Sequence, residues 1–141
     1  MLIASCTKEN DDPNNNTQTY STSGNSSGSQ VVPPVATSGS GTLSGTYNAS
    51  TNIWQYNITW SSLTTAATII EVRGPANAGF NGSLLFSIDN ITGGINGNAT
   101  GNMTLTADQE TYLLGDKCYY TILTPTNVAG EIRGQIIATA Q

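Results

Sequence analysis

The chain has 141 residues, a formal net charge of −5 and a sequence pI of about 4.2. Its length predicts one domain, and its four basic residues are too few to follow a phosphate backbone, so no nucleic-acid partner is expected. The absence of histidine excludes a histidine general base, a histidine-ligated zinc or copper site and a Ser-His-Asp triad. Charged residues make up only 9%, and the abundant short polar residues favour strands and turns over helices.

Residues 1–6 end in Ile-Ala-Ser-Cys, which resembles the lipobox of bacterial lipoprotein signals. In such proteins the cysteine, here Cys6, becomes the lipidated N-terminus. The basic and apolar regions of a full signal are missing, so we expect a start assigned late or a truncated chain. Lys8, followed by acidic residues, resembles the surface-export signal of Bacteroidetes lipoproteins. We therefore predict a lipid anchor on the outer face of the outer membrane; the alternative is an ordinary cysteine.

Residues 7–30 are rich in Asn, Ser, Thr and Gly, and Tyr20 is their only large apolar side chain. This composition predicts a flexible tether with a reach of roughly 25–30 Å. The folded domain is then expected over residues 31–141. No apolar run approaches the ~20 residues that a membrane-spanning helix needs, so the membrane is expected as a partner only through the lipid.

Alternation of apolar and polar residues begins after Pro33-Pro34 and predicts seven strands. The clearest covers residues 53–60, where the even-numbered side chains from Trp54 to Trp60 share one face. The strands are expected at residues 42–48, 53–60, 67–73, 83–88, 99–106, 117–124 and 131–139.

One short helix is expected after the fifth strand. Thr106 and Gln109 have the spacing of a capping box, and Gly115 can close the helix in the left-handed region. Without alternating strand and helix units, these elements predict an all-β fold. We expect an antiparallel β-sandwich or barrel of about seven or more strands with one short helix.

Six short segments carry a family resemblance: residues 31–35 (VVPPV), 41–43 (GTL), 73–76 (RGPA), 105–109 (LTADQ), 114–117 (LGDK) and 130–136 (GEIRGQI). Together they resemble the CHRD domain, first described in chordin and also found singly in bacterial secreted proteins. The last segment is the most specific. The resemblance covers about residues 30–139 and implies the fold, but the family lends no settled chemistry.

The CHRD family usually carries three histidines that this chain lacks. Two stand as His-x-His before Gly-Pro in the third strand, and one precedes a threonine in the sixth. The matching positions here are Glu71, Arg73 and Leu123. The resemblance therefore implies that any metal or polar site made by those histidines is lost in this protein.

Four charged residues at strand spacing form the first candidate site: Glu71, Arg73, Glu131 and Arg133. Each Glu-x-Arg pair is expected to share one face of its strand, and arginine offers a fork geometry to carboxylates. Two interpretations stay open, a structural set of ion pairs and a ligand-recognition patch.

Aromatic residues form the second candidate site. Trp60, Tyr119 and Tyr120 are either core residues or a stacking platform for sugar rings, and the two adjacent tyrosines are expected on opposite faces. Cys118 is expected to be a buried, inert thiol.

The function expected is a non-catalytic, surface-anchored module that binds an extracellular protein or polysaccharide. No cofactor or metal is predicted, since the stretch at residues 89–94 has one carboxylate only. The alternatives are a structural envelope lipoprotein and, less favoured, a glycoside hydrolase, which needs two carboxylates across a cleft. Its candidate carboxylates, none at suggestive spacing, are Asp89, Asp108, Glu110, Asp116 and Glu131.

Overall fold

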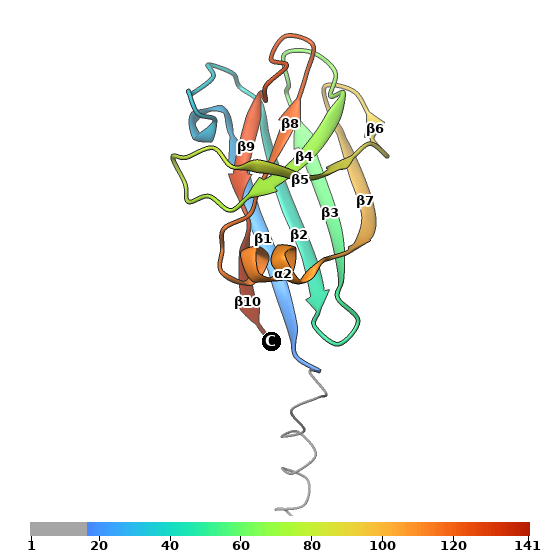
Figure 1. Ribbon diagram of the computed structural model, residues 1–141. Coiled ribbons are helices and arrows are strands. Elements are labelled where there is room, and N and C mark those ends of the chain that lie inside the picture. Colours follow the sequence, from blue (N-terminus) through green and yellow to red (C-terminus); the bar gives the residue numbers. More distant parts are fainter. Residues whose placement is uncertain (1–16) are drawn as a thin grey trace, which may run out of the picture.

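The computed structural model describes residues 17–141, and most of its regular elements are antiparallel β-strands (Figure 1). Cys6 and the expected signal therefore lie outside the described residues. The elements are β1 Thr19–Ser27, the 3-10 helix η1 Gly28–Gln30, β2 Ser40–Asn48, β3 Ile53–Ser61, β4 Ile69–Gly74, β5 Ser83–Ile88, β6 Thr92–Gly93, β7 Gly97–Thr104, the helix α2 Ala107–Leu114, β8 Tyr119–Leu123, β9 Ile132–Gln135 and β10 Ile137–Ala140.

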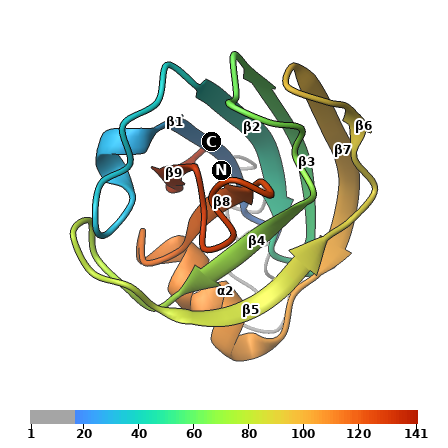
Figure 2. The same cartoon turned by 90° about the horizontal axis from the view of Figure 1, so that it is seen from above.

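The strands form one sheet in the order β5-β4-β8-β9-β1-β2-β3-β7-β6, with β10 also paired to β1. The sheet curls into a half-barrel, seen end-on in Figure 2. The last predicted strand is divided at Ile136, so that β9 pairs with β8 while β10 pairs with β1. This switch joins the two halves of the sheet. The predicted all-β antiparallel fold with one short helix is confirmed.

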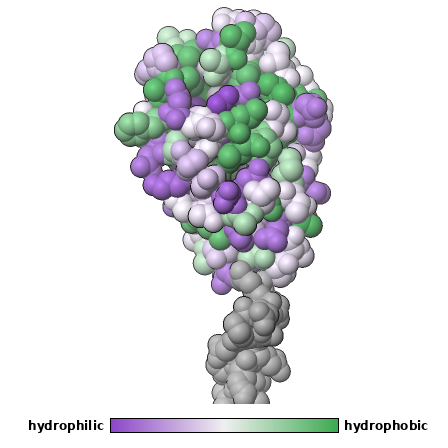
Figure 3. Space-filling view, in the orientation of Figure 1, coloured by the Kyte–Doolittle hydropathy of each residue, from purple (hydrophilic) through white to green (hydrophobic). Residues whose placement is uncertain are grey.

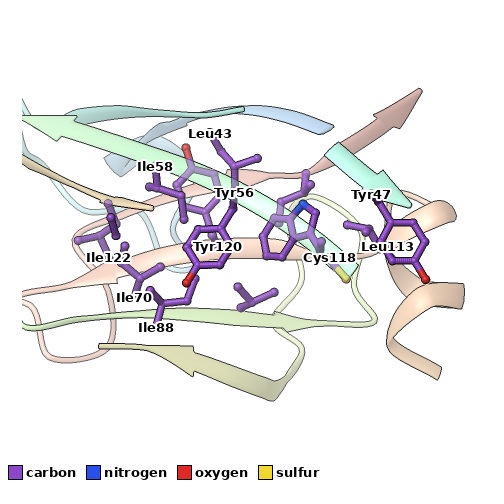
Figure 4. Packing of buried hydrophobic residues seen from close by; sticks show 14 of the residues in the cluster. Leu43, Tyr47, Tyr56, Ile58, Ile70, Ile88, Leu113, Cys118, Tyr120 and Ile122 are labelled. Carbon is purple, nitrogen blue, oxygen red and sulfur yellow. The ribbon is translucent and has the colours of Figure 1, made fainter. Parts of the chain in front are cut away.

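The core lies between the two halves of the curled sheet. Trp54, Ile58 and Trp60 on β3 are at most 4% exposed, as their alternation predicts. Figure 4 shows side chains from β2 and β3 facing those from β4, β5 and β8 across the core. Because β3 and β4 bury every second residue in this way, their apolar alternation fixes the register of these strands.

The helix α2 lies at one end of the half-barrel and begins with the predicted capping box. The Thr106 hydroxyl accepts from the Gln109 amide, and the Gln109 side chain accepts from the Thr106 amide. The left-handed residue at its end is Asp116 (φ 60°), whereas Gly115 has φ −92°, so the predicted role of Gly115 is wrong. No helix within residues 17–141 has the length and apolarity required to cross a membrane.

The strand β1 occupies part of the segment that was predicted to be a flexible tether. Thr19–Ser27 pairs along its whole length with β2, and on its other side with β10 and β9. The tether prediction is therefore wrong from Thr19 onward, while residues 7–16 lie outside the described part. Apart from Tyr20, which packs against the edge of the core, the core-facing residues of β1 are small and make room for large neighbours. Thr22 accepts a hydrogen bond from the Trp54 indole, and the Gly24 carbonyl accepts one from the Tyr120 hydroxyl.

Candidate functional site

The outward face of β4, β8 and β9 carries two rows of polar side chains. Glu71, Thr121 and Arg133 are paired neighbours across the three strands. Arg73, Tyr119 and Gln135 form the next row. Three of the four predicted charged residues therefore share one face.

Loops close over these rows and leave a pocket of about 290 Å³, which we call the outer pocket. Its walls come from the segment after η1, the β4–β5 loop and the β8–β9 loop. Asn81 on the second of these loops donates a hydrogen bond to the Val32 carbonyl on the first, 3.0 Å away. The lining residues are Val31, Val32, Glu71, Arg73, Asn81, Tyr119, Thr121, Leu123, Val128, Ala129 and Arg133.

Glu71 and Arg73 form an ion pair inside the outer pocket, with 2.8 Å between Arg73 Nε and Glu71 Oε1. Their side chains are 18% and 32% exposed. Arg73 Nη1 also donates to the Gly82 carbonyl at 2.9 Å, which fixes the start of β5. The pair is thus partly a structural element and partly open to the pocket.

Arg133 lies deeper, only 2% exposed. Its guanidinium carbon is 3.5 Å from the centroid of the Tyr119 ring, a cation–π contact. It donates to the side chain of Asn81, the carbonyl of Asn77 and the side chain of Gln135, at 3.2–3.4 Å. Burial lowers the pKa of this guanidinium, although the neighbouring Tyr119 opposes the shift.

Glu131 does not join this cluster, contrary to the expectation that it shares a face with Arg133. The strand β9 begins only at Ile132, and Glu131 occupies the bend before it. Its carboxylate is fully buried and accepts hydrogen bonds from Thr37, Thr64 and Thr124. Burial raises the pKa of this carboxyl, but the hydrogen bonds outweigh burial and hold the pKa below its ordinary 4.5.

Of the two interpretations left open for the aromatic residues, their burial excludes the exposed stacking platform. Trp60, Tyr119 and Tyr120 are 4%, 2% and 0% exposed. Trp60 and Tyr120 face the core, and Tyr119 lies on the opposite face beneath Arg133 and the β4–β5 loop, where its hydroxyl accepts from the Gly82 amide. Both faces of β8 are therefore covered, which alternation alone cannot reveal.

Two polar residues of the outer pocket, Thr121 and Asn81, were not predicted from the sequence. Thr121 follows Tyr119 by two residues, so strand spacing alone could have placed it on the same face. Asn81 is on a loop and carried no such signal. In the described part of the chain, no three His, Cys, Asp or Glu side chains gather as a metal site.

A model of the CHRD domain matches residues 22–136. The chain belongs to the CHRD-domain family. No curated protein and no solved structure matches it. Membership in the CHRD family indicates a binding module rather than an enzyme. The three positions that the sequence resemblance singled out, Glu71, Arg73 and Leu123, all line the outer pocket.

Proposed function

We propose that this CHRD domain is anchored by a lipid on Cys6 at the outer face of the outer membrane. There it binds a polysaccharide or protein outside the cell through the outer pocket. The observation that carries this proposal is a partly open pocket in which Glu71, Arg73 and Arg133 converge. A few charged groups in a pocket of about 290 Å³ supply specificity for a small portion of a larger ligand.

The geometry of the outer pocket disfavours the alternative that this protein is a glycoside hydrolase. Hydrolysis of a glycosidic bond needs an acid and a second carboxylate on opposite sides of the bond. Glu71 is the one carboxylate among the residues that line the outer pocket. Glu131 is fully buried and its pKa is lowered, whereas a general acid needs a raised pKa.

Glycan and protein arrays test the binding role directly. We expect the purified protein to bind at least one array component at micromolar concentration. Ala129→Trp should abolish that binding, because Ala129 is exposed and lines the outer pocket, which the indole would fill. Ala78→Trp, exposed on the β4–β5 loop outside the pocket lining, is the matched control. Equal binding by both variants, or no binding by the wild type, would count against the proposal.

Metabolic labelling with a fatty acid in a Bacteroidetes host tests the anchor. The motivation is the Ile-Ala-Ser-Cys sequence that ends at Cys6. We expect Cys6→Ala to lose the label and Cys118→Ala to keep it. Protease treatment of intact cells should remove the domain if it lies on the surface. Retention of the label by Cys6→Ala would refute lipidation at this residue.

A further inference from the structure

Arg133 is a buried cation without an anionic partner in the described part of the chain. The one ion pair among residues 17–141 with atoms within 4.0 Å joins Arg73 to Glu71. All three hydrogen-bond acceptors of Arg133 are neutral, and they lie at 3.2–3.4 Å. Charge-assisted hydrogen bonds are usually shorter, about 2.7–2.9 Å. The guanidinium is therefore oriented but not neutralised.

A buried, unpaired charge is costly, so a protein that keeps one usually has a use for it. Arg133 lines the outer pocket, and it is held in place by Tyr119 and by two residues of the β4–β5 loop. With Glu71 at −1 and with Arg73 and Arg133 at +1 each, the pocket carries a formal charge of +1. The whole chain carries −5. The outer pocket is thus locally positive and suited to an anionic ligand, although the protein as a whole is negatively charged.

The other residues that line the outer pocket indicate which chemical class of anion it can bind. Glu71 offers a carboxylate that can accept hydrogen bonds from hydroxyls, and the exposed Asn81 keeps one amide hydrogen and one lone pair beyond its bonds to Val32 and Arg133. Val128, 74% exposed, offers an apolar surface. A ligand with a carboxylate, several hydroxyls and an apolar ring face matches this set. An acidic peptide matches less well, because its acidic side chains present no ring face to Val128 and no ring of hydroxyls to the polar groups of the pocket.

We propose that the outer pocket binds a uronic acid residue of an acidic polysaccharide, with the sugar carboxylate at Arg133 and Arg73. The inference rests on the proposed binding function and specifies its ligand class. The pocket volume of about 290 Å³ suits a single sugar ring rather than a longer chain segment. Neighbouring sugars of the polysaccharide then lie outside the pocket.

Titration calorimetry on the full chain, with trigalacturonate as the probe, tests whether the outer pocket binds a uronic acid. We expect it to bind at least about tenfold more tightly than the neutral galactose trisaccharide, because the guanidinium–carboxylate contacts require the charge. The affinity should also fall as salt is added. Equal affinity for the two trisaccharides overturns the inference. Binding of an acidic peptide or of neutral glycans alone also overturns it, but leaves the proposed function standing.

Glu71→Gln locates the site without relying on a loss of binding. Removing the carboxylate beside Arg73 should tighten trigalacturonate binding about three- to tenfold, since a like charge is removed from the pocket. Misfolding cannot mimic such a gain. Asp89→Asn makes the same change in net charge at an exposed position outside the pocket lining, and should leave the affinity unchanged. Equal affinities for the two variants would place the anion elsewhere and overturn the inference.

Discussion

Glu131 holds three loops together through one carboxylate. Thr37 precedes β2, Thr64 follows β3 and Thr124 follows β8, and their four hydrogen bonds to Glu131 are 2.6–2.9 Å long. Because hydrogen bonds satisfy its charge, Glu131 needs no cation. The Glu-x-Arg spacing suggested an ion pair. The structure instead separates Glu131, whose charge is satisfied by hydrogen bonds, from Arg133, a buried cation at the outer pocket with no anionic partner among the described residues.

Glu131→Gln should destabilise the fold by about 2 kcal/mol at pH 7, because hydrogen bonds to a charged group are worth more than those to an amide. The folded pKa of Glu131 lies below 4.5, so its ionised form stabilises the protein above pH 4.5. This contribution is lost as the pH falls through the folded pKa.

Urea unfolding between pH 7 and pH 3 measures the effect of Glu131→Gln. The gap in unfolding free energy between wild type and variant should be full at pH 7 and shrink below pH 4.5. Asp89→Asn, at an exposed position, serves as the control and should change stability little. A gap that stays constant down to pH 3 would contradict the assigned role of Glu131.

Cys118 should be chemically inert in the folded protein. It is 3% exposed, and burial raises the pKa of its thiol to about 12. At pH 8 only about one thiol in 10,000 would then be the reactive thiolate. In a Cys6→Ala background, a thiol reagent such as DTNB should react only after urea unfolds the protein. Rapid reaction of the native variant would show that Cys118 is accessible.

At the scale of elements, sequence analysis found the strands that carry large apolar side chains and missed β1. The alternation of β3 is visible because tryptophan, tyrosine and isoleucine mark its buried face. After Tyr20, the inward face of β1 presents Thr22, Gly24 and Ser26, which do not differ in polarity from its exposed face. The conformation of β1 depends on the strands beside it. Its small residues fit beneath the large aromatic residues that these strands place in the core.

Removal of β1 should abolish folding. A chain that begins at residue 31, the sequence-predicted start of the domain, lacks the strand that joins β2 to β10. It would expose the edges of both halves of the sheet. We expect it to show no cooperative urea transition, whereas a chain that begins at residue 17 should unfold cooperatively. Cooperative unfolding of the shorter chain would contradict the role of β1.

Gly24→Val tests the close packing of β1 more finely. A Cβ atom at residue 24 would lie 2.4 Å from the Gln135 carbonyl oxygen, so the strand would have to move. We expect a loss of about 3 kcal/mol or more, at the upper end of overpacking effects. Ser23→Val, exposed on the same strand, is the matched control and should be nearly neutral. Thermal unfolding of both variants measures the difference.

At the scale of the whole molecule, the charged residues of the described part lie outside four of its strands. The strands β1, β2, β3 and β7 contain no charged residue. The face that carries β4 and β5 shows hydrophilic and hydrophobic residues intermixed (Figure 3). Recognition through charge is therefore possible at the outer pocket and not on the outer face of those four strands.

The residues of the outer pocket were only partly predictable. Strand spacing placed Glu71 and Arg73 on one face, and the CHRD resemblance marked both positions. The burial of Arg133 depends on Asn77 and Asn81, which lie more than fifty residues earlier in the chain. Contacts between loops so distant in sequence leave no periodic signal, so the pocket itself emerged only from the structure.

The most direct test of the account is an NMR titration of the isotope-labelled protein with trigalacturonate, recorded as amide and arginine side-chain shifts. The account predicts that the largest shifts occur at the outer pocket, at residues such as Val32, Asn81, Thr121 and Arg133. The outer faces of β2 and β3 should stay unchanged. Shifts concentrated on β2 and β3, or no shifts at saturating trigalacturonate, would contradict it.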